Sequence, residues 1–285
     1  MTDALDATSL QAPMSEWRRP ARTSVFPTLP HTTMTQKTLT ILTGASRGMG
    51  HAMAEQLLQD GAHLLCISRK TSLELAALAQ ARGAVLDQWS ADLADATPVA
   101  QRLTTWLAAL DPGLLTSATL INNAGVIPAI TPLRDTRSAE LSNALRVGLE
   151  APMQLCAAFL HVTQNWQLPR KVLNISSGLG RRAMASSGPY CAAKAGMDHF
   201  TRCLAMEEAS RVNGARICSL APGVINTDMQ VQLRGADPQA FPDLATFVGL
   251  HAQGLLASPA SAAEKVLAYL GRTDFGTQPV ADVRD

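Results

Sequence analysis

Tyr190 and Lys194 are four residues apart in a stretch whose pattern predicts an α-helix. At this spacing their side chains leave the same face of the helix, one turn apart. A phenol has a pKa of about 10 and is by itself a poor acid–base group at neutral pH. A neighbouring ammonium group favours the phenolate and would lower that pKa. The pair could therefore transfer a proton, although two solvated residues on a helix surface would have the same spacing.

A glycine-rich segment earlier in the chain could bind a phosphate. Gly44, Gly48 and Gly50 follow a short apolar run at 39–42 and precede a helix predicted over 51–59. Glycines at such a junction allow a tight turn and bring backbone N–H groups close to a pyrophosphate at the helix N-terminus. The spacing G-x-x-x-G-x-G differs from the usual G-x-G-x-x-G, and tight packing alone could also require glycine. Its place at the first strand–helix junction favours a dinucleotide site.

The residues after the second predicted strand favour one dinucleotide over the other. In doubly wound α/β folds that bind dinucleotides, a carboxylate at the end of the second strand binds the ribose 2′-OH of NAD, whereas an arginine nearby accepts the 2′-phosphate of NADP. The segment reads Ser68-Arg69-Lys70 and has no carboxylate, and Arg47 in the glycine turn could add a second positive charge. A planar guanidinium suits a phosphate. NADP(H) is therefore the expected cofactor, unless Arg69 and Lys70 merely solvate a loop.

The hydrophobic pattern predicts the fold. Short apolar runs alternate with helical stretches, which gives βαβ units and a parallel sheet covered on both faces. We therefore predict an α/β fold with a doubly wound, Rossmann-like parallel sheet of about seven strands in a single domain. The predicted strands are 39–42, 63–68, 85–89, 118–121, 171–175, 215–220 and 279–283, and the predicted helices are 51–59, 71–82, 97–110, 138–165, 190–210 and 260–271.

The composition narrows the class of protein. The chain has 285 residues, 47% of them hydrophobic, and a net charge of +1. This charge gives no argument for nucleic acid or an anionic membrane surface, and no apolar run approaches the ~18 residues that span a bilayer. The six histidines show no metal-ligand spacing, so no metal site is expected. The five scattered cysteines contain no C-x-x-C pair and are expected to be reduced thiols in a cytoplasmic protein.

Residues 1–37 differ from the rest of the chain. They are rich in Thr, Ser, Pro and Ala, and four prolines would interrupt any regular element. Acidic residues argue against a transit peptide, and there is no apolar core of a secretion signal. We expect a disordered N-terminal extension over 1–37 followed by one domain over 38–285. Met34 could also be the natural start.

Five motifs together resemble the short-chain dehydrogenase/reductase family. Their order along the chain, with the expected elements between them, is much more specific than any one motif, and the resemblance covers about 39–285. Ser177 lies 13 residues before Tyr190, which is the usual offset in the family. The motifs are Thr43-Gly44-x-x-x-Gly48-x-Gly50, Asn122-Asn123-Ala124-Gly125, Ser177, Tyr190-x-x-x-Lys194 and Pro222-Gly223-Val224-Ile225-Asn226-Thr227.

The resemblance implies a role for each matching residue. Tyr190 would be the general acid–base, Lys194 would lower its pKa and hold the nicotinamide ribose, and Ser177 would hydrogen-bond the substrate oxygen. With Arg69 and the catalytic pair itself, the implied cofactor-binding residues are Gly44, Ser46, Arg47, Gly48, Met49 and Gly50 at the glycine turn, Asp92 and Leu93 at the adenine, Asn123, Ala124 and Gly125 after the fourth strand, and Pro222, Gly223, Ile225 and Thr227 after the sixth.

One position departs from the family. The chain reads Val147-Gly148-Leu149-Glu150-Ala151-Pro152, so Gly148 stands where an asparagine is usual. In the family that asparagine supports a helix kink, and a backbone carbonyl there binds a water leading to the lysine. Glycine retains the carbonyl, while Asn143 lies about 140° around the helix and is a poor substitute. The proton relay, rather than the fold, is the feature in question.

Several stretches are most similar to the sepiapterin reductase and benzil reductase branch, which reduces vicinal dicarbonyls with NADPH. The segment 229–258 falls where the family places its lid, and its apolar residues could form a wall of the substrate pocket or be ordinary core. A small, neutral carbonyl compound is the expected substrate. Family members commonly pair two helices with those of a neighbour, and here the helix around 153–166 has an apolar stripe. A homodimer or homotetramer is therefore expected, although core packing alone could also explain the stripe.

Two alternatives to an NADPH-dependent carbonyl reductase remain open. The first is an NADP-binding regulator or scaffold with weak or no turnover, which the departure at Gly148 allows. Ser177, Tyr190 and Lys194 at working spacing count against it. The second is an NAD-dependent alcohol dehydrogenase of the same fold. The sequence leaves the physiological substrate and direction undetermined.

Overall fold

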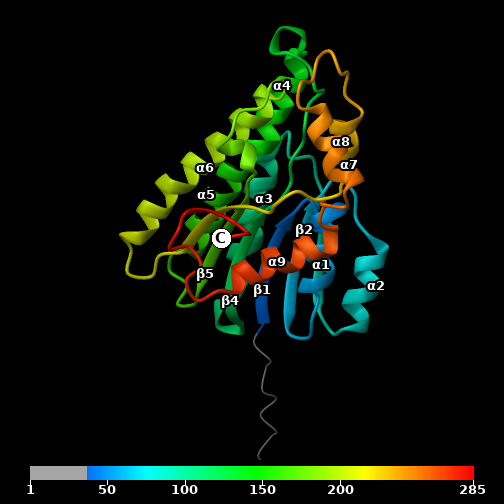
Figure 1. Ribbon diagram of the computed structural model, residues 1–285. Helices are drawn as coiled ribbons and strands as arrows, with labels where there is room; N and C mark the ends of the chain where they lie inside the picture. Colours follow the sequence, from blue (N-terminus) through cyan, green and yellow to red (C-terminus); the bar gives the residue numbers. More distant parts are fainter. Residues whose placement is uncertain (1–36) are drawn as a thin grey trace, which may run out of the picture. The chain divides into compact units, whose positions relative to one another are not determined.

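Strands and helices alternate along residues 37–285, the part of the chain that a computed structural model describes (Figure 1). The extension expected over 1–37, together with Met34, lies outside the described residues except for Lys37. That residue begins the first strand, β1, one position before the predicted start of the domain.

The strands form one parallel sheet in the order β3-β2-β1-β4-β5-β6-β7. The order reverses between β1 and β4, and in such a sheet ligands bind beyond the carboxyl ends of the strands at that point. The prediction of a doubly wound α/β fold is thus confirmed. The strands are β1 (Lys37–Thr43), β2 (Ala62–Ser68), β3 (Val85–Ser90), β4 (Leu115–Asn122), β5 (Arg170–Ile175), β6 (Arg216–Ala221) and β7 (Val280–Asp282).

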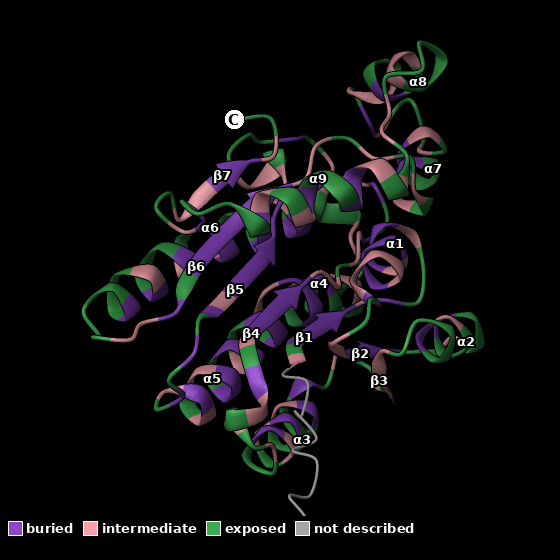
Figure 2. Cartoon of the chain, turned by 90° about the horizontal axis from the view of Figure 1, so that it is seen from below, coloured by how far each residue is buried: buried purple, intermediate pink, exposed green. Residues whose placement is uncertain are grey.

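Helices cover both faces of the sheet (Figure 1). One face packs against α3, α5 and α6, and the other against α1, α2 and α9. Coloured by burial, the central strands are buried almost throughout, and the exposed residues lie on the outer sides of the helices (Figure 2). The helices are α1 (Gly48–Leu57), α2 (Leu73–Ala81), α3 (Ala96–Ala108), α4 (Ser138–Leu145), α5 (Ala151–Thr163), α6 (Gly188–Ala209), α7 (Asp228–Arg234), α8 (Leu244–Ala252) and α9 (Pro259–Gly271).

The apolar runs of the sequence become two separate cores. Leu39 and Ile41 of β1 face the layer of α3 and α5, whereas Leu42 faces α1 and α9. Successive residues of a strand point to opposite faces, so a strand covered on both faces is buried on both sides. The continuous burial of residues 39–43 in β1 therefore follows from its central place in the sheet.

The helix predicted over 138–165 is divided. Between α4 and α5, residues Arg146–Glu150 form a π-helical segment with Gly148 at its centre. Single π-helical turns inside helices bend them and are frequent at functional sites. The departure from the family pattern and the break in the helix thus coincide.

The segment after β6 forms α7 and α8 beyond the carboxyl edge of the sheet (Figure 1). Leu233, Phe241 and Phe247 from this segment pack with Ile130 and Met184, and the rings of Phe241 and Phe247 stack with centroids 5.6 Å apart. These apolar side chains are buried in a small core of their own. That core joins α7 and α8 to the loop that precedes Tyr190.

Candidate active site

The glycine turn after β1 is held by close backbone contacts. Gly44 has a φ of +74°, which favours glycine. A Cβ placed on Gly50 would lie 2.1 Å from the carbonyl oxygen of Gly44, so no side chain fits between the turn and α1. The N-terminal turn of α1 contains no acidic side chain. The N-terminus of a helix carries a partial positive charge and free backbone N–H groups. Because no carboxylate competes for them at the start of α1, this end of the helix is suited to bind an anion.

Thr43 and Asn123 connect this turn to the end of β4. The Thr43 hydroxyl accepts hydrogen bonds from the backbone N–H groups of Asn123 and Ala124, each at 2.9 Å. The Asn123 amide donates back to the Thr43 carbonyl at 2.9 Å. The sequence pattern indicated Asn123 but gave Thr43 no role beyond its place in the motif. Its function as a connector depends on the pairing of β1 with β4.

The cationic residues predicted to select the cofactor are exposed near the same edge. Arg69 and Lys70 follow β2 as exposed side chains, and the buried hydroxyl of Ser68 accepts a hydrogen bond from the backbone N–H of Ala45 at 2.8 Å. Arg47 donates to Asp228, at the start of α7, with an Nη1–Oδ2 distance of 2.6 Å. This ion pair is exposed, so its net contribution to stability is small. Arg47 would have to exchange this partner to bind a phosphate.

Ser177, Tyr190 and Lys194 come together from two elements. Ser177 lies two residues after β5 and caps a short 3₁₀ turn, while Tyr190 and Lys194 lie on α6. The Lys194 Nζ donates to the carbonyl of Ile175 at 2.7 Å and lies 5.8 Å from the centroid of the Tyr190 ring. The Ser177 side chain is close enough to the Tyr190 hydroxyl to lower the pKa of this phenol as a hydrogen-bond partner. The predicted trio therefore forms one cluster.

The turn after β4 faces this cluster from the other side. A Cβ placed on Gly125 would be 3.8 Å from the Lys194 Nζ. The segment after β6 approaches the glycine turn, because a Cβ on Gly48 would be 3.6 Å from the Thr227 side chain. Ile225 forms an isolated bridge with Ala257. The turns that follow β1, β4, β5 and β6 thus meet at the carboxyl edge of the sheet.

The residues after β3 lie further along this edge. Asp92 is exposed and its carboxylate accepts a hydrogen bond from the backbone N–H of Ala94 at 3.0 Å. The Leu93 side chain is buried in the core between the sheet and α3. The implied contact of Asp92 and Leu93 with an adenine stays a prediction, and the burial of the Leu93 side chain limits that contact to the backbone of this residue.

Burial shifts the proton affinities of the Tyr190 and Lys194 side chains. It raises the pKa of Tyr190 to about 12, and the hydrogen bond with Ser177 acts in the opposite direction. It also lowers the pKa of Lys194 to about 8, against the effect of the Asp198 carboxylate. Burial and the neighbouring Cys191 thiol raise the Tyr190 pKa, and the expectation that Lys194 lowers it stays a prediction. Near neutral pH the phenol holds its proton and can donate it.

The break at Gly148 packs directly against α6. A Cβ placed on Gly148 would lie 3.1 Å from the Cβ of Ala193, the residue before Lys194. The π-helical segment is therefore in contact with α6 one residue away from Lys194. An asparagine here would require α6 or Ala193 to shift by a few tenths of an ångström.

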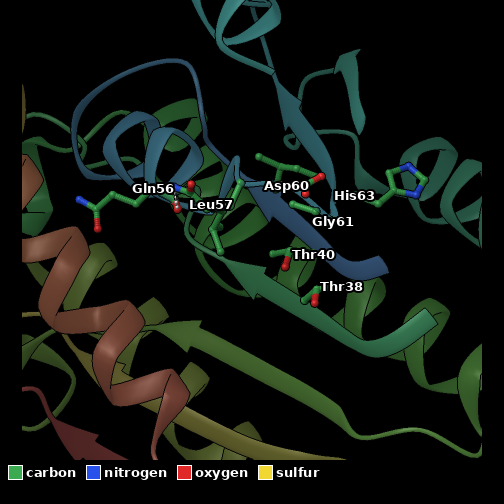
Figure 3. Close-up of a pocket in the computed structure, with 10 residues that line it drawn as sticks. Thr38, Thr40, Gln56, Leu57, Asp60, Gly61 and His63 are labelled. Atoms are coloured by element: carbon green, nitrogen blue, oxygen red, sulfur yellow. Dashed lines mark hydrogen bonds between the residues drawn. The ribbon is translucent and has the colours of Figure 1, made fainter. Parts of the chain in front are cut away.

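Two small pockets differ in their relation to this cluster. One of about 280 Å³ lies between the segment after Gly125, Glu140 and Asn143 of α4, and Gln232 of α7. The other, of about 240 Å³, lies at the amino ends of β1 and β2 beside Thr38, Thr40 and His63 (Figure 3). Neither pocket is lined by a predicted site residue. The lining of the first begins at Val126, the residue after Gly125.

Other site classes find no counterpart in the described part of the chain. Across residues 37–285, no three His, Cys, Asp or Glu side chains gather as metal ligands would. In the same range no helix combines the length and the apolar character needed to cross a bilayer. The five cysteines all have free thiols.

Comparisons with known proteins agree with this geometry. The family model for short chain dehydrogenases matches residues 38–237. Benzil reductase ((S)-benzoin forming) of Bacillus cereus is 34% identical over 82% of this chain and 94% of its own length. Sepiapterin reductase of Rattus norvegicus is 33% identical over 86% of this chain and 95% of its own. The crystal structure of the KRED1-Pglu enzyme is 26% identical, with a TM-score of 0.71 over 85% of this chain and 99% of that one.

Proposed function

Because this chain belongs to the short-chain dehydrogenase family of oxidoreductases, we propose that it is an NADPH-dependent carbonyl reductase. The reaction would convert a ketone or vicinal dicarbonyl compound into an alcohol. The observation that supports it most directly is the cluster of Ser177, Tyr190 and Lys194 beside the turns after β1 and β4. A bound cofactor and a carbonyl compound could meet at this cluster.

The residues of the first turn fit a dinucleotide. The contact between Gly50 and Gly44 leaves the N–H groups at the start of α1 open to a pyrophosphate. The turns containing Asn123, Gly125 and Thr227 would extend the site toward the ribose and nicotinamide. When bound, the cofactor supplies the hydride of this chemistry. Arg69, with no carboxylate at the end of β2, favours NADPH over NADH.

Side chains of the protein itself would donate the proton and bind the substrate oxygen. Tyr190 would donate its hydroxyl proton to the carbonyl oxygen, and Ser177 would hydrogen-bond the same oxygen. Lys194, held by the Ile175 carbonyl, would stabilise the phenolate that Tyr190 becomes and contact the ribose. A proton from solvent must then return to Tyr190. The break at Gly148 lies beside this return path.

The substrate class follows from the relatives and from the lining of the site. The benzil reductase that resembles this chain acts on an apolar dicarbonyl compound, and Cys191, the residue after Tyr190, packs against the apolar core that contains Met184 and Phe241. A neutral, hydrophobic vicinal diketone suits these surroundings. Exposed methionines on α5 and α6 support a homodimer or homotetramer, and the free thiols support a cytoplasmic location.

The direct test is steady-state oxidation of NADPH by the purified protein. The panel would contain an aromatic vicinal diketone such as benzil, an aliphatic diketone and a simple ketone, each measured with NADPH and with NADH. We expect turnover with NADPH, fastest on the aromatic diketone. Tight NADPH binding without oxidation would instead indicate a regulator or scaffold. A clear preference for NADH would contradict the argument from Arg69.

A further inference from the structure

A third ionisable side chain follows Tyr190 and Lys194 along the same face of α6. Asp198 lies one helical turn beyond Lys194 and is 2% exposed. Its Oδ1 accepts a hydrogen bond from the Ser219 hydroxyl at 2.7 Å. Its Oδ2 is buried and has no hydrogen-bond partner in the described part of the chain. The proposed reaction assigns this carboxylate no role.

The nearest cation to the unpartnered oxygen is a weak partner. The Nε of Arg181 lies 3.7 Å from Oδ2, and the arginine side chain is 36% exposed. Arg181 also donates to the backbone carbonyl of Ala281 at 3.1 Å. A buried carboxylate costs free energy unless it is paired and fully hydrogen-bonded. Ser219 and Arg181 satisfy Asp198 only in part.

The Lys194 ammonium group likewise lacks a full set of hydrogen-bond partners. This group is buried, and its only acceptor in the described residues is the carbonyl of Ile175. The loop after β5 packs on this part of α6, because a Cβ placed on Gly180 would lie 2.7 Å from the Asp198 Oδ2 and 3.0 Å from the backbone carbonyl oxygen of Lys194. Lys194 and Asp198 are both buried, one helical turn apart, so water has little access to either charge.

We infer that Asp198 is a positioning residue for Lys194, whose carboxylate holds the buried lysine in its charged form against the Ile175 carbonyl. The consequence for catalysis rests on the proposed function, but the interaction itself does not. The other groups that face this pair are few. They are Tyr190 from α6, Arg181 from the loop after β5, Cys218 from β6 and, through Arg181, Asp282 from β7.

The proton affinity of Lys194 is consistent with this arrangement. Burial lowers its pKa to about 8, and Asp198 is the charge that acts in the opposite direction. Without the carboxylate, the midpoint would fall toward neutral pH. A neutral Lys194 could neither stabilise a phenolate at Tyr190 nor bind a ribose as a cation.

The test is a titration of Lys194 in the full chain by NMR, with the lysine side chains labelled at the ε carbon. The chain's lysines are Lys37, Lys70, Lys171, Lys194 and Lys265, and the signal absent from Lys194→Arg assigns the resonance. Asp198→Asn retains the shape of the side chain and removes its charge. We expect the midpoint to fall by about one pH unit. An unchanged midpoint would overturn the inference.

Two further variants separate charge from packing. Ser219→Ala removes the hydrogen bond to Asp198 but keeps the carboxylate, so the Lys194 midpoint should change little. A fall as large as that in Asp198→Asn would contradict a role for the charge. Should Asp198→Asn fail to fold, Arg181→Gln decides: losing the competing cation should raise the midpoint, and a fall or no change would overturn the inference.

Kinetics distinguish this inference from the proposed function. In Asp198→Asn the alkaline limb of kcat/KM for NADPH should move to lower pH by the same amount as the NMR midpoint. Absence of turnover in the unmodified protein, with the NMR shift present, would contradict the proposed function alone. Normal turnover with an unshifted Lys194 midpoint would contradict the role of Asp198 alone.

Discussion

The glycine turn after β1 and the Tyr190 face of α6 lie at the same edge of the sheet but are built differently. The turn consists of backbone, and its shape depends on the absence of side chains at Gly44 and Gly50. The face of α6 consists of buried side chains whose charges depend on their surroundings. A backbone site tolerates changes of charge and fails when atoms are added. A site made of side chains tolerates small changes of shape and fails when the protonation states of those side chains change.

This difference also explains how the two regions are held together. Thr43 and Asn123 tie the turn to β4 through neutral hydrogen bonds that do not depend on pH. Lys194 is held against β5 by one hydrogen bond, which its ammonium group donates to the Ile175 carbonyl. We therefore expect pH to affect the reaction chemistry well before it affects the shape of the glycine turn.

The largest effect should come from removing the Tyr190 hydroxyl. Tyr190→Phe should lower kcat for diketone reduction by about 10²- to 10⁴-fold, the usual contribution of a general acid. The dissociation constant for NADPH, measured by fluorescence, should change little because the turn is intact. Tyr269, the other tyrosine of the chain, lies on α9 and is the matched control. Equal losses in Tyr190→Phe and Tyr269→Phe would argue against a catalytic role.

Raising the pH should separate the two regions next. Lys194, with a pKa of about 8, is charged below that pH and loses its proton above it. Tyr190, with a pKa of about 12, keeps its proton throughout this range. The value of kcat/KM for NADPH should thus be constant below pH 8 and fall about tenfold per unit above it. A rise of kcat/KM between pH 8 and 10 would contradict this assignment.

Adding a methyl group should damage the turn. Gly50→Ala places a Cβ against the Gly44 carbonyl, so we expect a loss of about 1–3 kcal/mol in the free energy of unfolding and weaker NADPH binding. Gly271→Ala is the matched control, since nothing lies within 4 Å of its added Cβ. Denaturant unfolding of both variants measures the difference. Equal stabilities would mean that the turn relaxes freely.

Removing a charge near the turn should alter the choice of cofactor. Arg69→Ala should raise the dissociation constant for NADPH about tenfold, in line with the loss of a charged hydrogen bond, and leave that for NADH unchanged. Arg272→Ala removes the same charge at the far end of α9 and controls for long-range effects. Parallel titrations with both cofactors provide the measurement. A similar change for NADH would show that Arg69 does not distinguish the 2′-phosphate.

The smallest effect should come from the break behind α6. Gly148→Asn restores the usual residue of the family, and we expect turnover a few-fold faster or a broader pH–rate profile, within the range of a relay that assists general acid catalysis. Because the new Cβ would meet Ala193, the double variant Gly148→Asn/Ala193→Gly provides the needed space. An unchanged pH–rate profile in both variants would show that the side chain at this position does not serve the relay.

Much of the fold and of the site could be predicted from local patterns. The alternation of apolar runs and helices predicted the parallel sheet, because both periods are visible within a few residues. The turn at Gly44, Gly48 and Gly50 could be predicted for the same reason, because glycines shape a turn through their own backbone. The interruption at Arg146–Glu150 was not predicted as a break, because residues on both sides of it have helical patterns.

The sequence by itself determined which side chains are present at the spacing of a reductase, and that its strands would bring them to one edge of a sheet. Only the tertiary structure decided their proton affinities. Tyr190 and Lys194 show the same four-residue spacing whether they are solvated or buried. Burial removes water from both, which raises the pKa of Tyr190 and lowers that of Lys194, so the neutral form of each side chain is favoured. The pairing of Asp198 with Ser219 and Arg181 likewise depends on β6 and on the loop after β5, which only the folded chain brings to α6.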